Sequence, residues 1–567
     1  MNADQRKLEH LRRLDEYRLN RAGPLGNDLI DELAAGELDR RGFLQRATLL
    51  GLSIGGIGAA LAAYDAPLAS ATRVRGQVGG RLRLAVLPPP AKDLEPHKLA
   101  DTGGLVTDGI AGEFLTRSTK NLTIVPELAL SWTPNAKATV WTFKLRPNVK
   151  FQSGQAFGAA DVVATYERLL GPDSGALSAY KGVLSSGNVK AVDNLTVQFV
   201  LDAPTASFPY LTSSATYQAI ILPRDYKLGT FDKTPQATGA FRLVSYTPGV
   251  GAKFDRNPNW WGGTAPLEGV DITYYADVAA QISALLGGQV DMLNEVQFAN
   301  ARALFNNSNV QIFPVRGAQN RTVGLRVNLN NPLKDRRVRQ AIALTLDRPG
   351  TVKTLFNQYA DIGNDSPFAP VYPMTNRSVP QRKKNIPLAK KLLAQAGYER
   401  GFKVPFIVQK NGEMPQLAQI LQRSAKAIGV DLALQLQTDA QFFAGKQWSP
   451  PCNYGNTPWL NGPMTLTGWG GRSVPNVYLS SEVKSCSIWN EAQYKNKALD
   501  KIIDRYLAAI ALSDQRKYAG QIQRTLLADT PFIFPYFFNS LAAGSKRVRG
   551  YNHDASAQVY LSRTSLA

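Results

Sequence analysis

The stretch VGLRVNLNNPLKDRRVRQAIALTLDRP, residues 323–349, decides the fold class of this chain. Its first seven residues have the apolar pattern of a strand. Asp335 then stands where a helix needs an N-cap, and apolar residues recur every four positions from Val338 onward. Asp347 and Pro349 begin a second helix in the same way. A strand followed by two capped helices predicts an α/β unit.

Similar units are expected on both sides of this stretch. Apolar alternation predicts strands, and apolar residues at helical spacing predict helices. Because the two types do not alternate strictly, the sequence predicts an α/β fold with α+β parts. An extended apolar run is expected at residues 531–538. Strands are expected at residues 81–87, 140–145, 195–201, 241–246, 269–275, 290–293, 402–408 and 430–436, and helices at 159–170, 279–286, 386–396, 415–428, 499–509 and 513–528.

The composition is that of a large globular protein. The 567 residues are 44% apolar and 19% charged, which suits three or four domains or two large lobes. Two cysteines exclude a disulfide-framework mini-protein and a multi-cysteine metal cluster, and three histidines argue against a His-rich metal or catalytic centre. We therefore expect no metal and no cofactor.

Residues 1–71 have the parts of an export signal. Arg40 and Arg41 precede Phe-Leu and a soft apolar run at residues 47–63, and the small residues 69–71 resemble a cleavage site. The paired arginines resemble the twin-arginine signature. We expect a periplasmic protein with a cleaved signal, the alternative being a retained N-terminal anchor.

The positive charge belongs to the part of the chain that follows this segment. Residues 1–71 hold nine Arg and Lys against ten Asp and Glu, so the remainder carries 56 against 34, a net charge of +22. The basic residues are scattered and accompany no nucleic-acid motif, so no nucleic-acid partner is expected. A solvated basic surface, a preference for an anionic ligand and attraction to membrane lipid all remain open.

Four blocks, in this order and spacing, resemble the extracytoplasmic solute-binding proteins of the peptide/nickel class of ABC importers. Each block alone is weak, whereas the set covers nearly the whole chain after residue 71. The first comprises residues 128–132, 141–151, 154 and 160–163, the second 238–241 with 256–261, the third 328–330 with 335–341 and 347–348, and the fourth 529–536.

The resemblance implies a two-lobed periplasmic binding protein fold of type II, with an extra subdomain and a ligand cleft between the lobes. Lobe I is expected at residues 72–320, with its inserted subdomain at about 116–236. Lobe II is expected at 321–530, and residues 531–567 return to lobe I. Such a protein, here expected to be a monomer, closes around a peptide or peptide-like solute and presents it to a membrane permease, without covalent chemistry.

The family's ligand segment in lobe II resembles Gly468, Trp469, Gly470, Gly471 and Arg472. In peptide binders this segment carries an aspartate that pairs with the peptide amine, and here the matching position is Arg472. A guanidinium cannot neutralise an ammonium but binds carboxylates and phosphates. An anionic non-peptide solute, such as an opine or a sugar phosphate, is therefore the alternative ligand. Arg472 could also point to solvent or pair with a protein carboxylate.

Five further residues occupy positions that resemble cleft positions of the family. Pro90 and Ala91 follow the first expected strand, Tyr180 stands where the family often has a cleft tyrosine, and Lys410 and Asn411 follow a lobe II strand. For each of them the alternative is an ordinary surface residue.

The two cysteines, Cys452 and Cys486, flank the segment around Trp469 and stand 34 positions apart. In an oxidising compartment they are expected to form a disulfide that braces this segment. Two free buried thiols are the alternative.

Two other classes of function are weaker. A hydrolase needs a nucleophile and a base, and only His97 and His553 follow residue 71. A DNA-binding regulator with the same sensor fold needs a helix-turn-helix ahead of the sensor, where residues 1–71 resemble an export signal instead. We therefore expect a binding protein and not an enzyme.

Overall fold

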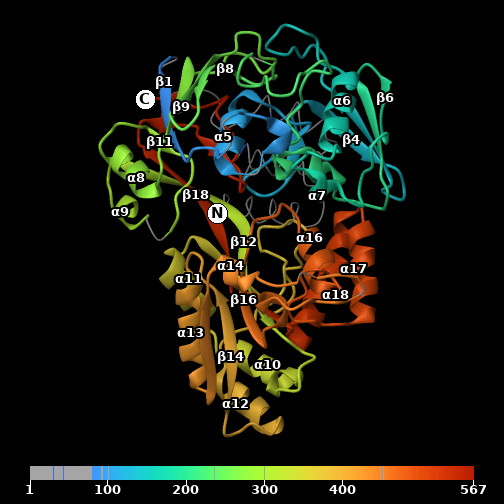
Figure 1. The fold of residues 1–567 in the computed structure, drawn as a ribbon, viewed down its shortest axis with the longest axis vertical. Coiled ribbons are helices and arrows are strands. Elements are labelled where there is room, and N and C mark those ends of the chain that lie inside the picture. The colour runs from blue at the N-terminus through green and yellow to red at the C-terminus, as the bar shows by residue number, and fades with distance from the viewer. Residues whose placement is uncertain are drawn as a thin grey trace, which may run out of the picture. The chain divides into compact units, whose positions relative to one another are not determined.

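The computed structural model describes Ile30, Leu33 and Phe43 and most of the chain from residue 79 onward (Figure 1). Arg40, Arg41 and Ala91 lie outside the described residues. One compact unit comprises residues 77–122 and 126–567, and a second comprises residues 1–76 and 123–125. The fold and the site below belong to the first unit. The described ranges are 79–90, 93–99, 101–234, 236–298, 301–446, 448–450 and 452–567.

A mixed sheet of twelve strands is the framework of this unit. Ten strands form its main path, while β13 (Ala360–Ile362) pairs with β18 and β17 (Phe532–Ile533) pairs with β12. Along the path the order is β15 (Val430–Gln437), β14 (Phe402–Gln409), β16 (Met464–Trp469), β12 (Val310–Leu325), β18 (Tyr536–Ser545), β11 (Met292–Leu293), β1 (Arg81–Val86), β10 (Gly269–Tyr274), β9 (Gly251–Arg256) and β8 (Phe241–Thr247).

The long strands β12 and β18 join the two halves of the sheet, and Figure 1 shows them side by side. The first part of β12 pairs with the end of β18, and this end of β18 also pairs with β11. The last part of β12 pairs with β16 and β17. The register between β12 and β18 shifts between Val315 and Gln319, as at a β-bulge. Gly317 lies within this shift, where an added Cβ would meet the Phe538 carbonyl oxygen at 2.6 Å.

In the first half, β1 pairs in parallel with both β10 and β11, while α8 (Val278–Leu286) packs on β11 and α5 (Thr102–Ala111) packs on β8. Asp101 and Asp277 cap these helices by accepting from backbone N–H groups. Two apolar clusters fill this half, one on each side of β1 as its side chains alternate.

An antiparallel sheet of four strands is inserted into the first half, in the order β4 (Ala129–Pro134), β5 (Val140–Leu145), β7 (Thr196–Val200) and β6 (Val189–Asp193). Helix α6 (Ala159–Leu169) packs on it, and α7 (Leu177–Tyr180) follows. Phe143, Phe199 and Phe208 form its aromatic centre with ring centroids 5.0–6.2 Å apart.

In the second half, β14, β15 and β16 are parallel and are covered by helices. Asp335 caps α10 and Asp347 caps α11, as the sequence predicted. The long helices α17 and α18 pack on each other. The helices here are α10 (Arg336–Ala343), α11 (Arg348–Phe356), α12 (Ile386–Gln395), α13 (Met414–Lys426), α14 (Asp439–Phe442), α15 (Pro458–Asn461), α16 (Asn476–Tyr478), α17 (Lys497–Ala508) and α18 (Leu512–Asp529).

The two-lobed α/β fold predicted from the sequence is confirmed. Two local predictions were inaccurate. The strand expected at residues 290–293 is shorter, at Met292–Leu293, and the strand expected at residues 323–329 is the end of β12, which begins at Val310 and stops at Leu325. Polar residues interrupt its first part, where it crosses between the halves. No helix within the described ranges is both long and apolar enough to cross a membrane.

Candidate ligand-binding site

Strand ends from both halves of the sheet converge on the middle of β12 and β18. Strand β11 runs toward this point because Met292 pairs with Gly544 and Leu293 with Ala543. Strand β16 arrives from the opposite side, with Met464 opposite Leu325 and Trp469 opposite Asn320. Parallel strands present their carboxyl ends to ligands. The fold therefore provides two such edges that face one another across the crossing strands.

A cavity of about 930 Å³ lies at this point. Its floor is the middle of β12 and β18, at Gln319, Arg321 and residues 538–541. One wall is formed by residues 295–298, which follow β11, and by residues 302, 305 and 306, on and just after α9 (Arg302–Phe305). The other comes from α11 and from residues 411–423, which follow β14. Its volume suits a small molecule or a short peptide.

Amide side chains dominate the polar lining of this cavity, and four phenylalanines supply its apolar surface. Each amide carries both donors and acceptors. The lining is thus suited to ligands with many hydrogen-bonding groups on an apolar frame. The amides are Gln297, Asn306, Gln319, Asn357, Asn411, Gln416, Gln419 and Asn539, and the phenylalanines are Phe298, Phe305, Phe356 and Phe538.

An ion pair is fixed in the floor of the cavity. Arg321 Nε lies 2.9 Å from Glu413 Oε1, and its Nη2 donates to Glu413 Oε2 at 3.0 Å. The Tyr536 hydroxyl donates to Glu413 Oε1 at 2.7 Å, and the Arg321 guanidinium lies over the Phe538 ring, 4.7 Å from its centroid. Both charged side chains are mostly buried, at 13% and 19% exposure. They neutralise one another and hold the floor in place.

The segment that the sequence singled out borders this cavity without lining it. The Gly468 N–H donates to Gln409 Oε1 at 2.9 Å, and a Cβ at Gly468 would lie 3.3 Å from Arg321 Nη1. A Cβ at Gly471 would lie 3.1 Å from Gln319 Cγ. The Gly470 carbonyl accepts from the Tyr478 hydroxyl. These small residues let the segment lie directly behind the cavity floor.

Trp469 points to the other face of the sheet, into a cluster of aromatic side chains. Its ring centroid lies 4.8 Å from that of Trp489 and 5.7 Å from that of Trp459, and its side chain is buried. Its indole Nε1 is buried without a hydrogen-bond partner. Arg472 is exposed, and its guanidinium donates to the Gly471 carbonyl at 3.3 Å.

The other predicted positions are not brought together. Asn411 lines the cavity, whereas the exposed Lys410 beside it does not. Pro90 is exposed after β1. Tyr180 is fully buried in the inserted subdomain, where its hydroxyl donates to the Leu211 carbonyl at 2.8 Å. The structure thus gives Tyr180 a role in the core.

Sequence reasoning missed most of the cavity lining. The polar face of the amphipathic helix α13 was the one sequence signal for this lining, because Gln416, Gln419 and Arg423 recur there at helical spacing. The segment at residues 295–306 carried no signal, because only the fold brings it opposite α11 and α13.

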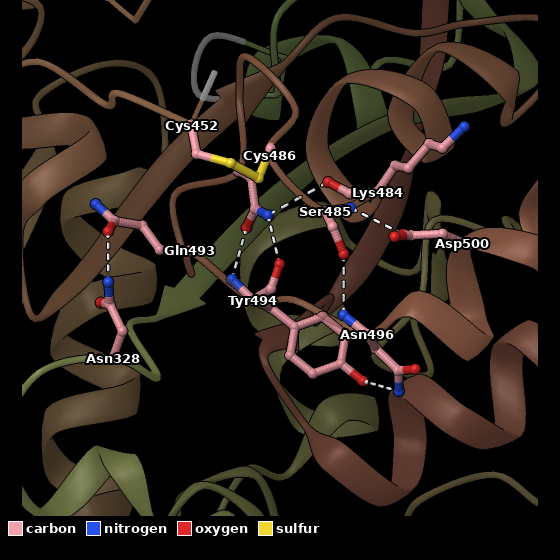
Figure 2. Close-up of a disulfide and its surroundings, with 10 residues drawn as sticks. Asn328, Cys452, Lys484, Ser485, Cys486, Gln493, Tyr494, Asn496 and Asp500 are labelled. Carbon is pink, nitrogen blue, oxygen red and sulfur yellow. Dashed lines mark hydrogen bonds between the residues drawn. A yellow bond between two sulfur atoms is a disulfide. The ribbon is translucent and has the colours of Figure 1, made fainter. Parts of the chain in front are cut away.

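Cys452 and Cys486 form a disulfide, with Cα atoms 4.5 Å apart, as predicted (Figure 2). Next to it, the Ser485 N–H donates to Asp500 Oδ1 at 2.9 Å, and the Ser485 hydroxyl accepts from the Asn496 N–H at 3.0 Å. Figure 2 shows these bonds tying the segment after the disulfide to the start of α17. The disulfide therefore braces the chain that follows Trp469.

A profile of the family described as "Bacterial extracellular solute-binding proteins, family 5 Middle" matches residues 123–491, well over half of the chain. The chain belongs to this family. The resemblance drawn from the four sequence blocks is thereby confirmed, and this family-5 solute-binding protein is of the class that serves peptide/nickel-type ABC importers.

Named relatives of this family-5 solute-binding protein cover most of its length. Heme-binding protein A of Haemophilus influenzae is 23% identical over 458 residues, spanning 76% of this chain and 81% of that protein. The oligopeptide-binding protein AppA of Bacillus subtilis is 25% identical over 483 residues, spanning 79% and 84%. The structure of HbpA2 from Haemophilus parasuis matches with a TM-score of 0.74 at 20% identity, over 86% of this chain and all of that one.

Proposed function

We propose that this protein captures a peptide or peptide-like solute in the cavity between its lobes and delivers it to an ABC permease. The observation that carries the proposal is the cavity itself. It lies where strand ends of both lobes meet, and its eight amides suit a ligand rich in N–H and C=O groups. Relatives named for heme and for oligopeptides show that the family's ligands are diverse.

Closure of the lobes over the solute is part of the proposal. Only a few strands cross between the halves, and the register shift between Val315 and Gln319 gives β12 and β18 a place to bend. A solute that contacts both walls stabilises the closed form over the open one. We assign lobe I to residues 72–320, lobe II to 321–530 and the returning segment to 531–567.

We further propose that the protein acts as a monomer in the periplasm, after twin-arginine export, and binds its solute without chemical change. Both histidines of the described ranges are already engaged. His97 Nδ1 lies 2.8 Å from Glu95 Oε1, and His553 Nε2 lies 2.9 Å from the Phe313 carbonyl oxygen. No group of three or more His, Cys, Asp or Glu side chains in these ranges is arranged to hold a metal ion.

An anionic non-peptide solute is the second candidate, favoured by Arg472. Its exposed guanidinium stands directly after β16 and makes no ion pair with any described carboxylate. A ligand that reached from the cavity to this position would present a carboxylate or phosphate there.

Native mass spectrometry of the purified protein separates the two candidates. The bound solute is released by unfolding and identified, and the refolded protein is then offered a pool of short peptides. A series of bound peptide masses supports the proposed function. A single bound anionic metabolite, with no uptake from the pool, overturns the peptide assignment in favour of the second candidate.

A further inference from the structure

Three basic side chains in the cavity wall have no carboxylate partner among the residues that the structure describes. Arg302 is on α9, Lys353 on α11 and Arg423 on α13, and all three line the cavity. None takes part in an ion pair or a hydrogen bond within the described part of the chain, and all three are exposed. They differ in this from Arg321, whose charge is balanced by Glu413.

The carboxylates of the lining do not balance these charges. Glu413 is committed to Arg321 and accepts a further hydrogen bond from Tyr536. Glu295 is the other carboxylate of the lining, and burial raises its pKa above the ordinary value, which favours its neutral form. The cavity therefore carries an excess of positive charge.

The cations come from opposite walls. Arg302 belongs to the segment after β11, in the first lobe, whereas Lys353 and Arg423 belong to helices of the second lobe. Like charges that approach across a cavity repel one another, so closure without a ligand is opposed. An anion between them reverses the sign of this interaction and favours the closed form.

We propose that the solute carries a carboxylate or phosphate group that Arg302, Lys353 and Arg423 bind together, and that this group drives closure. The inference rests on the proposed function only in taking the cavity as the solute site. It names the chemical class that the cavity selects, an anionic solute or a peptide with a free carboxylate. It also places the anion-binding group in the cavity wall and not at Arg472.

The charge is tested with a matched pair of variants on one helix. Arg423→Gln removes a cation from the cavity lining, whereas Lys426→Gln removes an exposed cation from the same helix outside it. Both side chains are exposed, so neither change should alter the melting temperature appreciably. Citrate is the first probe, measured by isothermal titration calorimetry at low ionic strength. We expect Arg423→Gln to weaken citrate binding about tenfold, the loss of one charge-assisted contact, and Lys426→Gln to leave it unchanged.

The second probe separates this inference from the proposed function. The refolded protein is offered a digest of serum albumin and the same digest after methyl esterification, which removes the carboxylates. We expect native mass spectrometry to detect peptides from the first digest and at least tenfold fewer from the second. Equal binding of the two digests would overturn the anion site while leaving the peptide function intact.

The remaining outcomes are equally decisive. Citrate binding with no uptake from either digest would retain the anion site and reject a peptide ligand. Citrate binding that both glutamine variants weaken equally, or no citrate binding at all, would reject the anion site.

Discussion

Glu491 should make the second lobe less stable as the pH rises from about 5 to 9. Its side chain is fully buried, and its Oε2 accepts from Trp459 Nε1 at 2.7 Å and from the Thr467 hydroxyl. The carboxylate of Glu482, also fully buried, lies near enough to be affected by the charge of Glu491. Burial raises the pKa of Glu491 from 4.5 to about 8, although the hydrogen bonds lower it in part.

The sign follows from proton binding. Between pH 4.5 and 8 the folded form retains a proton on Glu491 that the unfolded chain has released, so the free energy of unfolding falls as the pH rises. The stabilisation that the protonated Glu491 gives the folded form is complete below pH 4.5 and lost above about pH 8. At about 1.4 kcal/mol per unit of pKa, the loss in the free energy of unfolding over this pH range is at most about 5 kcal/mol. We expect a loss of a few kcal/mol, since partial opening to water relieves part of the cost.

The assay is urea unfolding at pH 5, 7 and 9 and constant ionic strength, followed by tryptophan fluorescence. Trp459, Trp469 and Trp489 lie in the aromatic cluster beside Glu491 and contribute a signal from this lobe, whereas the tryptophans at positions 132, 141, 260 and 261 report on the first half. Glu491→Gln keeps an acceptor for both donors but cannot titrate, so it should remove this group's share of the pH dependence, while Glu113 and Glu127, whose pKa values burial also raises, still contribute theirs. Glu399→Gln, at an exposed position, is the control, and it should leave the pH dependence of unfolding unchanged. An unchanged pH dependence in Glu491→Gln would refute the reasoning.

Two further predictions concern stability. Replacing both Cys452 and Cys486 by serine should lower the free energy of unfolding by about 4 kcal/mol, from a closed loop of 34 residues, and reductant should then have no further effect in a urea titration. Asp365→Ala should cost about 3–5 kcal/mol by the same measurement, because it leaves the buried Arg348 and Arg382 side chains without their shared carboxylate. A cost below 1 kcal/mol for Asp365→Ala would contradict the assigned ion pairs.

Local signals in the sequence were sufficient for many of the longer helices and strands, although they did not indicate α5, β4, β6, β9 or β16. Asp335 and Asp347 mark helix starts because a cap needs only a short side chain and nearby N–H groups. The strand at residues 140–145 was predicted at its observed bounds because its burial alternates. Strand β12 was predicted only at its end. Its middle part carries polar side chains such as Gln319 and Arg321 toward the cavity, and these interrupt the apolar pattern from which a strand is predicted. Its length depends on long-range pairing with β18, which no local pattern contains.

The cavity was beyond the reach of local signals for the same reason. Arg302, Lys353 and Arg423 are separated by 51 and 70 positions in the sequence and meet only through the fold. Family resemblance directed attention to Trp469, whose segment the structure does place next to the cavity. The resemblance gave no information on the face of β16 from which the Trp469 side chain projects, because the register between β16 and β12 determines that face. Asn411 was predicted correctly as a residue near strand ends, although its contact with ligand stays a prediction.

Hydrogen–deuterium exchange with and without bound solute tests most directly the claim that the solute is held between the lobes in this cavity. The solute that co-purifies is used, with citrate as a second probe. We expect slower exchange in all three wall segments, at residues 295–306, 353–357 and 411–423, because closure buries both walls together. If the solute slows exchange elsewhere in the chain but leaves these three segments unchanged, the assignment of the cavity as the solute site is contradicted.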